Sequence, residues 1–105
     1  MMTVFAAAID DLFADPNLAC DAFWRAGGND PAVPVRVIAR RPDSATLQFE
    51  VRASLPAMIA DVRASEVAQP VEGDRLTIGA ATYVVRKAEA DGEGLIWRLD
   101  LDPLA

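Results

Sequence analysis

Any chemistry in this chain would have to come from its carboxylates, because the other common catalytic side chains are missing or isolated. The sequence has no histidine and a single cysteine, Cys20. The commonest general base is therefore absent, and the thiol has no histidine to activate it. Three close acidic pairs could hold a hard cation weakly, but none has the spacing of a calcium loop. We interpret them as solvated charge and expect no enzymatic activity, no metal and no cofactor. The pairs are Asp10/Asp11, Asp91/Glu93 and Asp100/Asp102.

Binding motifs for nucleotides or nucleic acids are weak. Gly27-Gly28 lacks both the spacing of a dinucleotide fingerprint and the lysine of a phosphate-binding loop. Trp24 and Trp97 could stack on single-stranded bases, but Trp97 falls on the apolar positions of its segment and is expected in the core. Trp24 is harder to place, and we expect it to be exposed at a partner surface. The formal net charge of −6 argues against a broad nucleic-acid footprint.

The N-terminal segment predicts one short amphipathic helix. Phe5, Ile9, Leu12 and Phe13 recur at helical spacing within residues 3–14. Pro16 ends the pattern, because a proline disfavours helical geometry at the residue before it. An isolated helix of about 12 residues is marginal in water. It must therefore pack on the sheet of its own chain or on a neighbouring subunit, and we slightly favour the neighbour.

Beyond residue 22 the apolar period changes to two, which is typical of strands with one buried face. Turn residues recur at close intervals, and Asp91-Gly92 is a hairpin signal. We expect a mainly β chain, a single domain over residues 1–105, with a helix in 1–15 and a small antiparallel barrel or sandwich over 22–102. Strands 35–40 and 47–53 are predicted to pair as a hairpin, and 57–63 is a weaker strand. Further short strands are predicted to begin at Phe23, Leu76, Tyr83 and Leu95.

The segment from Val71 to Leu101 has a distinctive order of turns and strands: a Gly-Asp turn, Leu-x-Ile, a glycine turn, Tyr-x-Val, an Asp-Gly turn and an alternating apolar strand. This order resembles the C-terminal half of the small head–tail joining proteins, connectors or stoppers, of lambda-like long-tailed phages. Related proteins occur in phage-like gene transfer particles. Arg63–Val67 and Phe5–Phe13 are similar to shorter elements of that family, whereas residues 42–57 do not match clearly.

The resemblance implies a structural virion protein with no catalytic residues. It implies a cyclic homo-oligomer, six-fold by resemblance, that lies below the portal and closes the DNA exit channel or provides the tail docking surface. Portal or adaptor proteins would lie above this ring, and a tail terminator or other tail proteins below it. DNA would pass through without specific binding. A tail terminator or tail-completion protein remains an alternative, as does a host β-barrel module that binds a peptide or small ligand.

The sequence also allows expectations about where the protein acts and which residues contact other subunits or line the channel. No signal peptide or apolar run of about 18 residues is visible, so we expect assembly in the bacterial cytoplasm, a place in the particle neck and no membrane. The candidate subunit-interface residues are Phe5, Ile9, Leu12, Phe13 and Trp24. The candidate channel-facing residues are Asp43, Asp91 and Glu93, because acidic groups on a channel wall repel phosphate.

Overall fold

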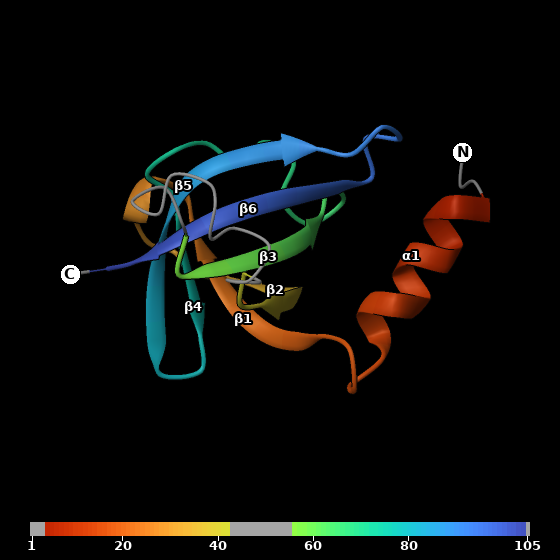
Figure 1. Ribbon diagram of the computed structural model, residues 1–105, viewed down its shortest axis with the longest axis horizontal. Coiled ribbons are helices and arrows are strands. Elements are labelled where there is room, and N and C mark those ends of the chain that lie inside the picture. The colour runs from red at the N-terminus through yellow and green to blue at the C-terminus, as the bar shows by residue number, and fades with distance from the viewer. Residues whose placement is uncertain (1–3, 43–55, 105) are drawn as a thin grey trace.

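The structure, a computed structural model, describes residues 4–42 and 56–104. Its strands form a closed barrel in the order β1-β2-β3-β6-β5-β4, with antiparallel pairing throughout (Figure 1). The predicted fold class is therefore confirmed. The elements are α1 (Val4–Ala14), β1 (Cys20–Arg25), the 3-10 turn η1 (Ala26–Gly28), β2 (Val33–Arg40), β3 (Met58–Arg63), β4 (Arg75–Ile78), β5 (Ala81–Ala90) and β6 (Ile96–Pro103).

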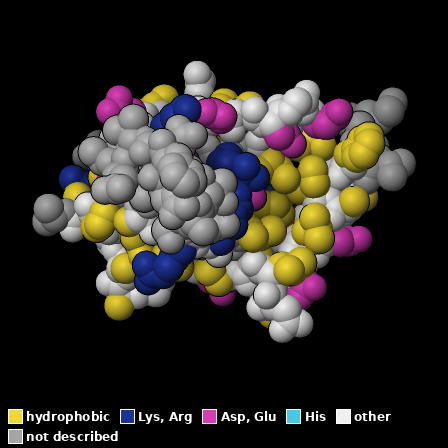
Figure 2. Space-filling view, viewed as in Figure 1, with side chains coloured by type: hydrophobic (Ala, Val, Ile, Leu, Met, Phe, Trp, Pro, Cys, Tyr) yellow, Lys and Arg dark blue, Asp and Glu magenta, His cyan; other side chains and the backbone are white. Residues whose placement is uncertain are grey.

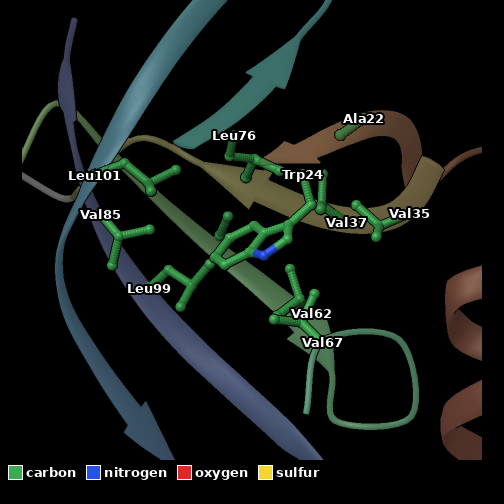
Figure 3. Close-up of a cluster of buried hydrophobic side chains, with 11 residues drawn as sticks. Ala22, Trp24, Val35, Val37, Val62, Val67, Leu76, Val85, Leu99 and Leu101 are labelled. Atoms are coloured by element: carbon green, nitrogen blue, oxygen red, sulfur yellow. The ribbon is translucent and has the colours of Figure 1, made fainter. Parts of the chain in front are cut away.

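Strand alternation fills the barrel with apolar side chains, because successive residues of a strand point to opposite faces. Ala60 pairs with Leu99 and Val62 with Trp97, and all four side chains point inward. The Trp24 indole lies among side chains from several strands (Figure 3). Each large apolar side chain gains about 1.5–3 kcal/mol on full burial, so this cluster is the main source of stability. Its buried members are Ala22, Trp24, Val35, Val37, Ala60, Val62, Val67, Leu76, Val85, Leu99 and Leu101.

Strand β2 pairs with two described strands. Residues 37–40 of β2 pair with β3, and residues 33–37 pair with β1. The predicted partner at 47–53 lies outside the described residues. The 57–63 segment looked weak because Ala60 contributes little apolar bulk, yet β3 lies between β2 and β6 and both Ala60 and Val62 are 0% exposed. A small residue is what a tightly filled barrel needs at that position.

A buried carboxylate ties together two loops that are distant in the sequence. Asp74 is 3% exposed, and its two oxygens accept the backbone N–H groups of Gly27 at 2.6 Å and Val71 at 2.8 Å. Gly28 has a φ of +77°, and a Cβ there would lie 2.8 Å from the Nε of Arg75. The Gly27-Gly28 pair therefore makes a tight turn beneath an arginine side chain.

Helix α1 stands beside the barrel and not across one of its faces. Figure 1 shows α1 at one end of the molecule and the C-terminus at the opposite end. Among the strands, α1 contacts chiefly β2. The helix ends before Asp15, whose carbonyl accepts the N–H groups of Leu18 at 3.1 Å and Ala19 at 2.9 Å. The helix therefore ends just before Pro16, as expected, and the chain turns there towards β1.

Candidate assembly surfaces

Two arginines of the barrel fix the C-terminal half of α1, and we call them the anchor arginines: Arg36 on β2 and Arg63 at the end of β3. The Nε of Arg36 donates to the carbonyl of Phe13 at 2.9 Å, and one terminal nitrogen donates to the carbonyl of Ala19 at 3.2 Å. These bonds satisfy carbonyls at and beyond the helix end, where a cation is also favoured by the helix dipole. Arg36 therefore caps α1 from a strand.

Arg63 contacts side chains of the helix, whereas Arg36 binds backbone carbonyls. Its guanidinium donates to Asp10 at 3.0 Å, pairs with Glu66 at 2.8 Å and lies 5.4 Å from the ring centre of Phe13. Burial opposes the charged form, but the hydrogen bonds to Glu66 and Asp10 outweigh it and raise the pKa of Arg63 above its ordinary value. Asp10 therefore contacts the barrel, although its side chain is still 41% exposed, so the expectation of solvated charge holds only in part.

The structure divides the predicted subunit-interface residues into two groups. Phe13 is 1% exposed and Trp24 is 7% exposed, both packed within the chain. The prediction that Trp24 is exposed is wrong, because the indole fills the centre of the barrel. Ile9 is half-buried beside a small hollow of about 90 Å³ between α1 and the barrel. Only Phe5, at 63%, and Leu12, at 46%, present most or much of their side chains outward.

An exposed aromatic side chain on the barrel was missed by sequence reasoning. Phe23 is 49% exposed on the outer face of β1, while its neighbour Trp24 points inward. The segment CDAFWR has two adjacent aromatic residues and no clear apolar alternation, so its pattern does not indicate which of them is buried. Figure 2 shows further apolar side chains gathered over the α1 end of the molecule. The outer surface therefore carries apolar groups on both α1 and the barrel.

The predicted channel-facing residues are only partly described. Asp91 and Glu93 lie in the exposed turn between β5 and β6, and Asp43 lies outside the described residues. One Asp91 oxygen accepts the N–H groups of Leu95 at 3.0 Å and Ile96 at 3.4 Å, so this carboxylate shapes its own turn. Glu93 is exposed and makes no hydrogen bond or ion pair with the described residues.

The outer surface of the barrel across β2, β3, β6 and β5 is charged, and we call it the charged face. Asp61 accepts from Arg40 at 3.4 Å and from Arg98 at 3.3 Å, and Glu89 pairs across the strands with Arg98. A hydrogen bond from Lys87 lowers the pKa of Glu89 below its ordinary value. A hollow of about 360 Å³ opens beside Asp61 and Arg98. Three carboxylates, Asp61, Glu89 and Asp91, line this hollow together with Arg98. Asp61 is engaged by two arginines and Asp91 by backbone N–H groups of its own turn.

The described part of the chain has no cluster of three or more metal-ligating side chains. Helix α1, the α-helix within the described ranges, has 11 residues and is too short to cross a membrane. The barrel interior is packed with side chains, so the outer surface is where a partner would bind. The exposed apolar groups are the described features best suited to contact with a protein partner.

Comparison with known families gives the class of assembly. The model of the Phage Head-Tail Attachment protein family matches residues 2–101. The chain therefore belongs to the phage head–tail attachment family, whose members are structural proteins of the head–tail junction and not enzymes. The resemblance noted in the sequence is confirmed. A search of the curated proteins finds no match.

Proposed function

We propose that the chain forms a closed ring of identical subunits at the head–tail junction, below the portal. The ring closes the DNA exit channel, provides the surface on which the tail docks, or does both. Portal or adaptor proteins contact it above and tail proteins below, and assembly takes place in the bacterial cytoplasm. The observation that carries the proposal is the family match, because it spans residues 2–101 and thus nearly the whole chain.

The closed barrel limits how copies can meet. A barrel leaves no unpaired strand edge for β-sheet extension, and each described strand already has two neighbours. Contacts between copies must therefore use side-chain surfaces. A ring also needs a head-to-tail contact between two different surfaces of the subunit, one that closes after a full turn. Phe5 and Leu12 on α1 supply one apolar surface that the chain does not bury itself.

Removal of this chain tests the proposal at the level of the particle. Particles assembled without it should contain filled or partly emptied heads and separate finished tails, because the junction layer is missing. Negative-stain electron microscopy of the lysate measures the ratio of joined to separate parts, and supply of the chain from a plasmid is the control. Normal numbers of joined particles without the chain would contradict the proposal.

The acidic turn between β5 and β6 is proposed to face the channel. DNA must pass without sticking, and a cation on the wall would attract phosphate in a salt-dependent way. Glu93→Lys should therefore slow DNA passage, while Glu93→Gln, which removes charge without reversing it, should have a smaller effect. Glu93 is chosen over Asp91, because Asp91 also holds backbone N–H groups. The measurement is the rate of DNA release from joined particles at low and high salt. Equal release rates for Glu93→Lys and Glu93→Gln would contradict a position of Glu93 in the channel.

A further inference from the structure

One row of outward-facing residues on the barrel carries no charge. The strand register places Pro34 beside Phe23, Phe23 beside Thr77, and Thr77 beside Thr82. Leu104 continues the row, because its N–H donates to the carbonyl of Thr82 at 3.0 Å. We call these five residues the uncharged belt. Phe23, next to the Pro34 end, is 49% exposed, and Leu104, at the other end, is 41% exposed, so both halves of the belt offer apolar area to a partner.

The belt contrasts with the rest of the barrel exterior. On the charged face, Arg40, Asp61 and Arg98 satisfy one another within the chain. Such exposed pairs contribute little to binding, since water and salt screen them. In the belt, the hydroxyl groups of Thr77 and Thr82 lie 3.0 Å apart and bond to each other, and Arg25 also donates to the Thr77 hydroxyl at 3.5 Å. These hydroxyl groups are therefore satisfied within the chain. An apolar surface of this kind is suited to a protein partner.

Helix α1 offers a surface that is complementary to the belt. Phe5, Ala8 and Leu12 are exposed and recur at i, i+3 and i+7, which places them on one helical face. Asp11 is exposed next to this face, and α1 carries no basic residue. The row beside the belt holds two arginines at paired positions of β1 and β4, Arg25 and Arg75. Arg25 pairs with Asp30 at 3.2 Å, whereas Arg75 has no ion pair with the described residues. An apolar helix with an exposed carboxylate thus matches an apolar belt that has Arg75 at its border.

We propose that the uncharged belt receives the Phe5–Leu12 face of α1 from the neighbouring copy in the ring; this inference rests on the ring proposed above. Within one molecule, α1 and the Leu104 end of the belt lie at opposite ends (Figure 1). One copy can therefore give its helix to the next and receive a helix from the previous one. Every copy carries one helix and one belt, so a closed ring leaves neither surface uncovered.

Cross-linking between two differently marked populations tests this contact directly. The exposed native thiol is first removed by Cys20→Ser. Leu12→Cys is introduced into one population and Phe23→Cys into another, and both are produced together during particle assembly. A short bismaleimide should give covalent dimers in joined particles from the mixed sample and not from either single-variant sample. Ile59→Cys, on the charged face, replaces Phe23→Cys in the matched control and should give none.

A substitution series gives a second measurement. Phe23→Glu should abolish head–tail joining with an unchanged melting temperature, because Phe23 points away from the core. Val71→Glu is the matched control, since Val71 is 52% exposed and lies outside the belt. It should leave joining intact.

The outcomes separate this inference from the ring itself. Joined particles that contain the chain but cross-link through Leu12 and Ile59, or not through Leu12 and Phe23, would overturn the inference alone. Normal joining by Phe23→Glu would do the same. Joined particles whose necks lack the chain would overturn both the ring and the contact.

Discussion

At the scale of single residues, the charged side chains that matter most are those that connect segments distant in the sequence. Asp74 fixes the η1 turn to the start of β4, and the anchor arginines Arg36 and Arg63 fix α1 to β2 and β3. Each contact replaces water around backbone or side-chain groups that are partly or fully buried. Loss of one partner therefore leaves the other unsatisfied, which costs more than the contact itself contributes.

Substitution of Asp74 should measure the strength of one such connection. Asp74→Ala leaves the N–H groups of Gly27 and Val71 without their acceptor in a buried loop. Hydrogen bonds to charged groups contribute about 1.5–3 kcal/mol each, and we expect the free energy of unfolding to fall by about 3 kcal/mol. Urea denaturation at neutral pH measures this change.

Asp30→Ala is the matched control for Asp74→Ala. The Asp30 side chain is 88% exposed and pairs with Arg25 at 3.2 Å. Its removal should change the free energy of unfolding by less than about 1 kcal/mol. Equal losses for the two variants would show that Asp74 does not hold the loops as described.

The sequence indicated some of these residues but not their partners. The Gly-Asp turn at 73–74 was recognised as a turn, yet nothing in the local pattern connects Asp74 with Gly27, which lies 47 positions away. Trp24 and Phe23 were ambiguous for a related reason. Which of two adjacent aromatic residues is buried depends on the pairing of β1 with β2 and β4, and that pairing is set by distant strands.

At the scale of elements, α1 has two parts with different environments. The face with Asp10 and Phe13 is held by the anchor arginines, while the face with Phe5 and Leu12 remains exposed. The apolar period alone predicted the helix and its approximate ends, because helical spacing is a local property. The period could not show which apolar residues of the helix are buried by the chain itself and which stay exposed for a partner. That depends on which part of the helix lies against the barrel.

Substitutions on the two faces of α1 should have opposite effects. Phe13→Ala removes a fully buried ring, and changes of this kind cost about 3–5 kcal/mol of stability. Phe5→Glu combined with Leu12→Glu changes exposed positions and should alter stability by no more than about 1 kcal/mol, yet it should prevent head–tail joining. Thermal unfolding and counts of joined particles are the two measurements.

Point substitutions are preferable here to deletion of residues 1–15, which would remove both faces at once. If Phe5→Glu with Leu12→Glu unfolded the barrel, α1 would belong wholly to the core of its own chain. If it left joining normal, the exposed face would have no role in assembly.

The elements were predicted best where alternation was strong and the turn chemistry was clear. Strands β2, β5 and β6 and the turn at 91–94 agree with the pattern. The hairpin predicted between β2 and residues 47–53 lies outside the described residues, and the described neighbours of β2 are β1 and β3. Pairing between non-adjacent strands, such as β3 with β6 and β1 with β4, follows from closure of the barrel and has no local signal.

At the scale of the whole molecule, the division of the exterior favours assembly over catalysis. The charged face is satisfied within the chain and the barrel interior is full. Exposed apolar side chains lie on α1 and the uncharged belt, and also at Leu18, Val33 and Val71. The net charge of −6 is compatible with a wall past which DNA moves freely. These features agree with membership of the phage head–tail attachment family and leave the ring as the central proposal.

The most direct test of this account is a cryo-electron microscopy reconstruction of the particle neck. It should reveal a closed ring of this barrel between the portal and the tail, with six-fold symmetry if the resemblance extends to stoichiometry. Each α1 should lie against the next subunit, and the turn at 91–94 should face the axis. A neck without density for this chain, or with the barrels present as isolated monomers that leave the channel unringed, would contradict it.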